Sequence, residues 1–327
     1  MTNIKENEDL IKIKFCDMYR NFDENNNIFT DVIKRKFKGY QITDEPDFLI
    51  YSCFGTDHHR YMNRNCVKIF YTGEAITPNF CECDYAIAFD RLTFGDRYIR
   101  RPVWLYNTKG PVSCDLTDER ALNRKFCNFI YSNAKDGANA KLRIEFARKL
   151  MEYKQVDCPG NVLNNMSSEA LNPREGDWQS GKLAFLKDYK FTIAFENCCF
   201  DGYVTEKLLD PFVAHSVPIY MGDPRITEDF NSEAFICANR YEDRLDELIR
   251  KVIELDNDDE AYLKMLHTDP RGKAYDPHEM DKLEGFLTDI FRKGNVPYEK
   301  DPRGFVRRMS FDGLGRKDKI KYLLFRK

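Results

Sequence analysis

Short runs of apolar residues recur along the chain, and amphipathic stretches separate them. The runs that predict buried strands are IKIKFC (11–16), FLIYSCF (48–54), VKIFY (67–71), YAIAF (85–89), KFCNFIY (125–131), FTIAF (191–195) and VPIYM (217–221). Apolar residues recur at helical spacing in residues 138–153 and 241–255, which predicts two amphipathic helices. Strands that alternate with helices in this way are typical of an α/β architecture.

The length of 327 residues favours two domains of ordinary size. A segment rich in Gly, Pro, Asn and Ser follows the first predicted helix. We therefore expect a domain boundary near Tyr153, with an N-terminal domain over 1–153 and a C-terminal domain over 154–327.

The composition limits the classes of partner. A net charge of -3 gives the chain no bulk attraction to nucleic acid. The eleven cysteines lack the regular spacing of a disulfide framework, so we expect buried thiols in a reducing compartment. Residues 1–17 alternate charged and apolar positions instead of forming a signal peptide or a membrane span, which favours a cytoplasmic location.

Two motifs resemble nucleotide or metal sites only in part. Residues 176–182 have the glycine and lysine spacing of a phosphate-binding P-loop, but Leu183 replaces the Ser or Thr that reaches magnesium. Asp256 and Asp258 form an Asp-x-Asp pair within a polar run between two predicted helices. A solvated turn is the better interpretation of that pair.

Two further pairs carry metal-binding side chains, His58 with His59 and Cys81 with Cys83. Neither has the paired spacing of a closed zinc site. We interpret them as polar surface and packing residues and predict no metal site.

The segment FTIAFENCCFDGYVTEKLLD (191–210) places charged residues where a buried strand gives way to a helix. Thr205 is a predicted N-cap, so Glu206 and Lys207 fall in the first helical turn. A lysine there opposes the helix dipole, and a bound anion would offset both charges. Asn197 ends the strand at the same edge, where α/β sheets bind ligands. An ordinary capped strand–loop–helix is the alternative.

Two strings resemble a known enzyme family. Residues 189–224 (YKFTIAFENCCFDGYVTEKLLDPFVAHSVPIYMGDP) resemble the sugar-nucleotide motif of the α1,3/4-fucosyltransferases, and residues 67–90 (VKIFYTGEAITPNFCECDYAIAFD) resemble the acceptor-side motif of their bacterial branch. The resemblance implies a GT-B fold, with two Rossmann-like domains that face each other across a cleft. The C-terminal domain would hold GDP-fucose, and the N-terminal domain would hold the acceptor.

The resemblance also implies roles for particular residues. Tyr203, Glu206 and Lys207 match residues that contact the donor, with the lysine at the phosphates and the glutamate at sugar hydroxyls. Asn197 is a weaker member of this set. Because fucosyl transfer leaves negative charge on the departing GDP, Lys207 and the helix N-terminus would stabilise it without a metal. No cofactor is expected, since GDP-fucose is a co-substrate.

Glu74 is the predicted general base. It follows the strand VKIFY and a turn at Thr72 and Gly73, and the base proposed for the family stands at this place in the motif. Without the resemblance, a solvated surface glutamate would be the better interpretation.

One departure from the family lies in residues 158–164, which carry no cation where relatives commonly have an arginine or lysine for the diphosphate. Either Arg174 or Lys182 replaces it, or the affinity for the donor is lower. The tail 303–327 holds nine Lys and Arg against two Asp. It predicts either peripheral contact with an anionic membrane or a basic helix that packs on the core.

The sequence thus predicts an inverting fucosyltransferase that uses GDP-fucose and an oligosaccharide or lipid-linked glycan acceptor containing GlcNAc, with an α1,3 linkage. Two alternatives remain: a GT-B enzyme that uses another nucleotide sugar, and a glycan-binding protein without catalysis.

Overall fold

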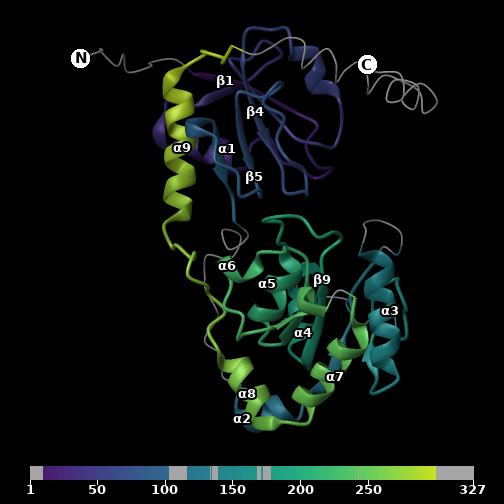
Figure 1. Ribbon diagram of the computed structural model, residues 1–327. Coiled ribbons are helices and arrows are strands. Elements are labelled where there is room, and N and C mark those ends of the chain that lie inside the picture. Colours follow the sequence, from purple (N-terminus) through teal and green to yellow (C-terminus); the bar gives the residue numbers. More distant parts are fainter. Residues whose placement is uncertain are drawn as a thin grey trace, which may run out of the picture. The chain divides into compact units, whose positions relative to one another are not determined.

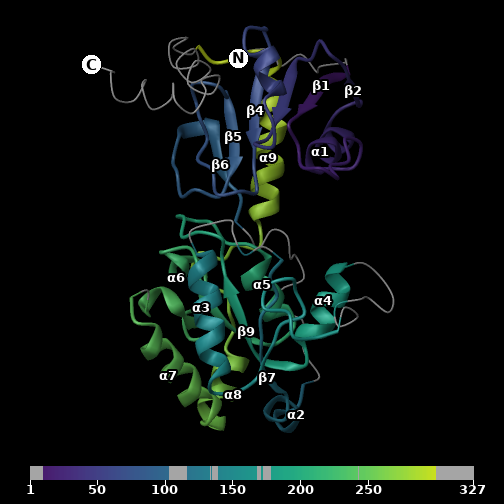
Figure 2. The same ribbon diagram turned by 90° about the vertical axis from the view of Figure 1, so that its right-hand side faces the viewer.

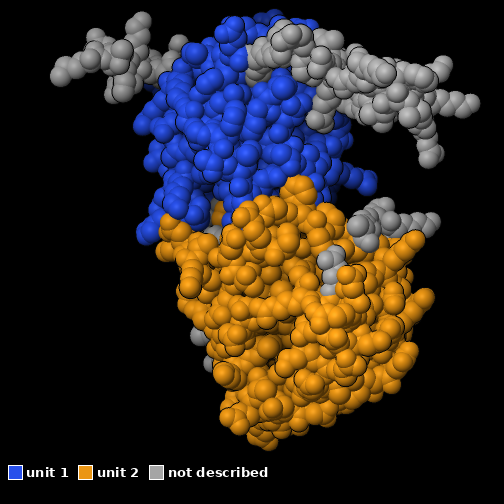
Figure 3. Space-filling view, in the orientation of Figure 1, with its two compact units in different colours: residues 1–101, 278–327 blue, residues 102–277 orange. Residues whose placement is uncertain are grey.

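The chain forms two compact units in a computed structural model that describes residues 10–102, 116–132, 134, 139–167, 171, 178–241 and 243–299. Unit 1 comprises residues 1–101 and 278–327, and unit 2 comprises residues 102–277 (Figure 3). Each of the seven apolar runs contains a strand, so the predicted α/β architecture is confirmed.

Unit 1 is built on a parallel six-stranded sheet in the order β2-β1-β3-β4-β5-β6 (Figure 2). Strands β3 and β5 are buried along their whole length, as expected for a parallel sheet covered on both faces. The elements are β1 (Ile11–Cys16), α1 (Ile28–Lys36), β2 (Tyr40–Ile42), β3 (Phe48–Tyr51), η1 (Asp57–Tyr61), β4 (Val67–Tyr71), β5 (Tyr85–Ala88), η2 (Gly95–Arg97), β6 (Tyr98–Arg100) and α9 (Glu279–Lys293).

Helix α9 returns to unit 1 after the chain has completed unit 2, and it lies beside α1 (Figure 1). The ring of Phe291 lies 5.0 Å from that of Phe48 in β3 and 6.0 Å from that of Phe37, centroid to centroid. Arg35 donates to Glu284 over 2.7 Å at the surface of the same contact. The core of unit 1 is therefore assembled from two distant parts of the sequence.

Unit 2 is built on a parallel five-stranded sheet in the order β11-β10-β9-β7-β8. Helices α3 and α7 lie on one side of the sheet and α4 and α5 on the other (Figure 2). The elements are α2 (Asp118–Leu122), β7 (Lys125–Asn128), α3 (Ala140–Met151), β8 (Val156–Asp157), α4 (Trp178–Leu186), β9 (Tyr189–Phe195), α5 (Glu206–Val213), β10 (Val217–Met221), α6 (Ile226–Asp229), β11 (Ile236–Cys237), η4 (Ala238–Tyr241), α7 (Leu245–Asp256) and α8 (Asp259–His267).

The order of the strands reverses between β7 and β9, because β8 extends the sheet on one side of this pair and β10 on the other. In a doubly wound sheet such a reversal opens a crevice beyond the carboxyl ends of the two strands, and ligands bind there. Unit 2 therefore has its expected ligand site where β7 and β9 end.

The domain boundary expected near Tyr153 is wrong, because Tyr153 lies inside unit 2, two residues after the end of α3. The division lies between Arg101 and Pro102, and the chain returns to unit 1 at His278. Strand β7 pairs in parallel with β9, and Phe146 of α3 stacks on Phe195 of β9 at 5.3 Å. These contacts make residues 125–151 part of the same unit as β9.

Two other expectations concern the membrane. No helix in the described part of the chain is long and apolar enough to cross a bilayer. The basic tail 303–327 lies outside the described residues, so its proposed membrane contact stays a prediction.

Candidate functional site

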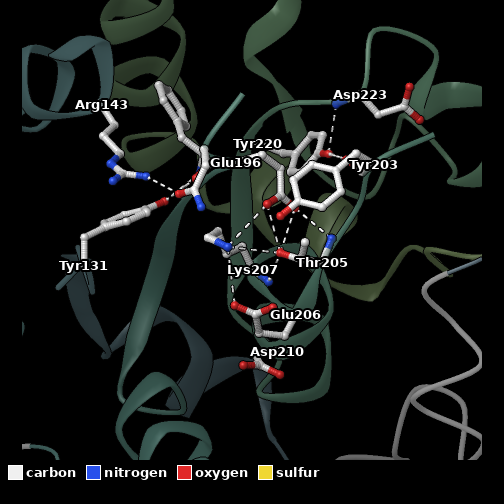
Figure 4. A network of polar contacts seen from close by, with 12 residues as sticks. Tyr131, Arg143, Glu196, Tyr203, Thr205, Glu206, Lys207, Asp210, Tyr220 and Asp223 are labelled. Carbon is white, nitrogen blue, oxygen red and sulfur yellow. Dashed lines mark hydrogen bonds and ion pairs between the residues drawn. The ribbon is translucent and has the colours of Figure 1, made fainter. Parts of the chain in front are cut away.

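The candidate site of unit 2 lies where β9 ends and α5 begins (Figure 4). All seven residues of β9 are buried, and the strand is followed directly by Glu196 and Asn197. The intervening loop returns the chain to Thr205, which caps α5 by accepting a hydrogen bond from the backbone N–H of Lys207 over 3.3 Å. The predicted cap and helix start are confirmed.

Glu196 anchors the loop to the end of the strand. Its side chain is fully buried, and its Oε1 accepts hydrogen bonds from the backbone N–H of Thr205 over 2.7 Å and from the Thr205 hydroxyl over 3.0 Å. Gly222 makes room for it, since a Cβ there would lie 2.6 Å from Glu196 Cγ. Burial raises the pKa of Glu196 above its ordinary value, and the charge of Lys207 offsets this only in part.

Lys207 lies between two carboxylates at the beginning of α5. Its Nζ is 3.4 Å from Glu196 Oε2 and 3.4 Å from Glu206 Oε1, and it donates to Thr205 Oγ1 over 3.2 Å. Burial lowers the pKa of Lys207, but the two carboxylates outweigh burial and raise it above the ordinary value. The lysine is therefore a fixed cation, and its side chain is 19% exposed.

A second cation, Arg143 of α3, lies at the same end of β9. Its Nη1 donates to Asn197 Oδ1 over 2.9 Å, and its guanidinium lies 4.3 Å from the centre of the Tyr131 ring, just beyond β7. Burial lowers the pKa of Arg143 from its ordinary value, but an arginine keeps its charge in proteins. The arginine thus joins the chain beyond β7 to the chain beyond β9.

Tyr203 is 4% exposed and belongs to the loop that leads to α5. Its carbonyl accepts a hydrogen bond from the Tyr220 hydroxyl over 3.4 Å. Asp223, which is fully buried, accepts from the backbone N–H of Gly202 over 3.0 Å, and Gly202 has φ +80°. These bonds fix the backbone of the loop, while Glu206 remains about half exposed.

The structure thus brings four predicted donor residues together in one unit: Asn197, Tyr203, Glu206 and Lys207. The predicted base, Glu74, belongs to unit 1. It is exposed in the turn after the carboxyl end of β4, where its backbone N–H donates to the Thr72 hydroxyl over 2.9 Å.

Two family models match the chain. Residues 13–107 match the Alpha-(1,3)-fucosyltransferase FucT N-terminal domain, and residues 122–281 match the Glycosyltransferase family 10 (fucosyltransferase) C-term. The chain belongs to glycosyltransferase family 10.

Relatives and solved structures agree with this family 10 assignment. The chain is 32% identical to Alpha-(1,3)-fucosyltransferase FucT of Helicobacter pylori over 285 residues, which cover 75% of this chain and 56% of that protein. It is 36% identical to GDP-fucose protein O-fucosyltransferase 3 of Homo sapiens over 124 residues, or 37% of this chain and 25% of that protein. The chain therefore spans about half or less of the length of these curated relatives.

The crystal structure of an alpha1,3-fucosyltransferase with GDP-fucose matches at a TM-score of 0.68 and 25% identity, covering 89% of this chain and 93% of that chain. This match and the two Rossmann-like units confirm the α/β fold of the GT-B type.

The second cation differs from the sequence interpretation of this family 10 chain. Arg143, not Lys182, is the second cation near Asn197, since Lys182 lies in α4 and pairs with buried Asp210 over 2.7 Å. Arg174 lies outside the described residues. A signal for Arg143 existed, because it occupies the buried stripe of its helix with Phe146 and Leu150.

The two incomplete motifs have structural roles. Residues 178–182 of the P-loop-like region lie in helix α4. Asp258 caps α8, in the predicted turn between two helices. Asp256, however, is not solvated as expected: it is 7% exposed and binds Lys154 over 2.5 Å and Lys190 over 2.9 Å.

Proposed function

We propose that this family 10 chain transfers L-fucose from GDP-fucose to a hydroxyl group of a GlcNAc-containing glycan, with inversion at the anomeric carbon and an α1,3 linkage. The observation that carries the proposal is the pair of cations, Lys207 and Arg143, at the carboxyl ends of the strands that flank the topological reversal of unit 2. The names of the H. pylori and human relatives both describe fucosyl transfer.

The diphosphate is assigned to the beginning of α5. Backbone N–H groups and the positive end of the helix dipole favour an anion there. Lys207 and Arg143 carry two positive charges against the carboxylates of Glu196 and Glu206, so the N-terminus of α5 supplies the further positive potential that favours a diphosphate. As the bond to fucose breaks, charge grows on this diphosphate, and both cations stabilise the transition state.

The remaining donor residues position the sugar. Glu206 follows the cap of α5 and is about half exposed, so its carboxylate is accessible to accept hydrogen bonds from fucose hydroxyls. Tyr203 is only 4% exposed and its carbonyl is held by Tyr220, so we assign it to shaping the loop beside the donor. Asn197 orients Arg143 through its side-chain oxygen.

Glu74 is the proposed general base. An inverting displacement needs the acceptor hydroxyl to lose its proton as it attacks the anomeric carbon from the face opposite GDP. A carboxylate exposed after the carboxyl end of β4 is accessible to such a hydroxyl.

The transfer itself is proposed to need no metal at the diphosphate. Two cations and a helix N-terminus are the proposed source of positive charge at the donor site. The Asp-x-Asp pair considered from the sequence has other roles, since Asp256 forms an ion pair with Lys190 and Asp258 caps α8. The alternative of a glycan-binding protein without catalysis rested on a missing cation, and Arg143 is the proposed replacement for that cation.

A second acceptor class has a specific observation in its favour. The match to GDP-fucose protein O-fucosyltransferase 3 covers 37% of this chain, and that relative is named for a protein acceptor. A serine or threonine hydroxyl of a peptide is therefore the second candidate.

The test is a turnover assay with GDP-fucose and either N-acetyllactosamine or a mixture of Ser/Thr-containing peptides, with product linkage read by mass spectrometry and NMR. We expect fucosylated N-acetyllactosamine, and inhibition by GDP at concentrations where UDP has no effect. Product with peptides alone would assign the second acceptor class. Stronger inhibition by UDP would mean that another nucleotide sugar is the donor.

A further inference from the structure

Two histidines that the sequence interpretation treated as surface or packing residues converge with Glu82 in unit 1. Each of His58, His59 and Glu82 offers a nitrogen or oxygen atom, and these three atoms lie within 4.8 Å of one another. His58 is 7% exposed and Glu82 is 4% exposed, whereas His59 is intermediate. The two histidines belong to η1, and Glu82 comes from the segment that leads into β5.

Asp17 fixes the orientation of His58. One of its oxygens, Oδ2, lies 2.5 Å from His58 Nδ1 and also accepts the backbone N–H of His58 over 2.9 Å. Because an ionised carboxylate only accepts hydrogen bonds, Nδ1 carries the proton. The other ring nitrogen, Nε2, faces Glu82 Oε2, which is 3.9 Å away. A carboxylate behind a histidine in this way is typical of metal sites.

The backbone is shaped to hold this carboxylate. Asp17 has φ +55°, and the second oxygen, Oδ1, accepts the backbone N–H of Asp57 over 2.9 Å. Gly55 allows the close approach, since a Cβ at this position would lie 2.3 Å from Asp17 Oδ1. His58 also stacks on Tyr51 at 4.3 Å between ring centres. The imidazole is therefore held by both packing and hydrogen bonds.

Glu82 is oriented in a similar way by Asn79. The amide nitrogen Nδ2 of Asn79 donates to Glu82 Oε1 over 2.9 Å, and its backbone carbonyl accepts the N–H of Glu82 over 2.8 Å. The other carboxylate oxygen, Oε2, is the one that faces His58. Both ligand side chains thus have a partner behind them.

The charges also favour a bound cation. The side chains of Asp17 and Glu82 are each 4% exposed, so two carboxylates lie in a largely buried cluster with the histidines. Their negative charge would stabilise a divalent cation bound there. Two imidazoles and a carboxylate are donors that zinc accepts, with bonds of about 2.0–2.2 Å.

We propose that His58, His59 and Glu82 bind one divalent cation of the zinc class, with Asp17 as the positioning residue. Tetrahedral ligand atoms on zinc lie about 3.3 Å apart, so binding draws the three side chains together by up to about 1.5 Å. The cation joins η1 to segment 72–84, which contains both Glu74 and Glu82. It therefore holds the segment that carries Glu74, and the proposal does not depend on the activity assigned above.

The test uses the full chain purified without a polyhistidine tag and stripped with a chelator. Titration with Zn²⁺ by calorimetry, and with Co²⁺ by visible absorption, is expected to show one site per chain. His59→Ala and Glu82→Gln are expected to weaken binding at least tenfold, and Asp17→Asn about 10- to 100-fold. His278→Ala is the control, because this exposed histidine lies outside the cluster, and its binding is expected to match the wild type.

Thermal unfolding gives a second readout. Zn²⁺ is expected to raise the unfolding temperature of the wild type and of His278→Ala, because it binds the folded state, and to leave Glu82→Gln unchanged. Absence of one-to-one binding by the wild type would overturn the proposal. So would equal affinity in the wild type, His59→Ala and Glu82→Gln, since the cluster would then be a buried ion pair of protonated His58 with two carboxylates.

Discussion

Replacing Lys207 by alanine is expected to weaken the binding of GDP. The Nζ atom is held 3.2 to 3.4 Å from three oxygen atoms at the beginning of α5, so little side-chain freedom is lost when a phosphate arrives. A charge-assisted contact contributes about 1–3 kcal/mol, which raises the dissociation constant of GDP about 5- to 150-fold.

The same substitution has a second effect, on stability. It leaves the fully buried Glu196 with hydrogen bonds from Thr205 but without the cation that lies 3.4 Å from its Oε2. A buried acceptor that loses its partner costs about 1–3 kcal/mol of unfolding free energy, and more when it is charged. A weaker affinity alone would therefore not distinguish a lysine that binds GDP from one that only neutralises Glu196.

A double-mutant cycle separates the two effects. Glu196→Gln keeps an oxygen for Thr205 and removes the buried charge, so Lys207→Ala combined with Glu196→Gln restores most of the lost stability. It does not restore GDP affinity if Lys207 contacts the diphosphate. The assays are calorimetry with GDP and urea unfolding, and Lys251→Ala on α7 is a matched control because this lysine is about half exposed and pairs only loosely with Glu254 at 3.8 Å.

Two results would refute this reasoning. Unchanged GDP affinity in folded Lys207→Ala would place the diphosphate elsewhere. Recovery of wild-type GDP affinity in the double variant would show that Lys207 acts only as the counter-ion of Glu196.

Four further expectations can be measured separately. Glu74→Gln should lower turnover about a hundred- to ten-thousandfold with GDP affinity unchanged. The control is Glu45→Gln, at another exposed glutamate; turnover of Glu74→Gln as high as that of the control would mean that Glu74 is only a surface residue. Arg143→Lys should weaken GDP binding at least fivefold in calorimetry, because lysine lacks the planar fork that bonds Asn197, and equal affinity would contradict this. GDP affinity should be the same with and without EDTA, whereas a loss restored by manganese would place a metal at the diphosphate. Because burial raises the pKa of Glu196 above 4.5, the folded state binds its proton more tightly, and this carboxyl's contribution to stability is lost as pH rises through the folded pKa. The free energy of unfolding of Glu196→Gln, measured with urea, should therefore increase relative to that of the wild type as pH rises above 4.5. The opposite trend would refute this expectation.

The strands were predictable because each is a nearly continuous apolar run, as buried parallel strands require. The pairing of the strands was not. Residues 125–128 are adjacent to residues 189–195 in the sheet, and nothing in the local pattern of either segment specifies a partner about 60 positions away. For that reason, the glycine- and proline-rich stretch after Tyr153 was interpreted as a domain boundary, although the chain crosses between units at Arg101 instead.

The candidate site shows the same division. Thr205, Glu206 and Lys207 were predictable because capping and helix-start charges are local. Arg143 acts through Asn197, 54 residues away in the sequence, so only its position on a buried helix stripe indicated it. His58 and Glu82 meet through tertiary packing, and sequence spacing alone predicted no site there. Asp17 joins them from the end of yet another strand, β1.

The return of α9 to unit 1 affects the order in which the protein forms on the ribosome. Unit 2 is one continuous segment, 102–277, and its strands are all synthesised before α9 emerges. The first strands of unit 1 leave the exit tunnel early, but Phe48 has no Phe291 to pack against until nearly the whole described chain has been translated. Unit 2 is thus free to fold while the N-terminal part of unit 1 still exposes apolar residues that α9 will later cover. Chaperones are most useful to unit 1 during this interval.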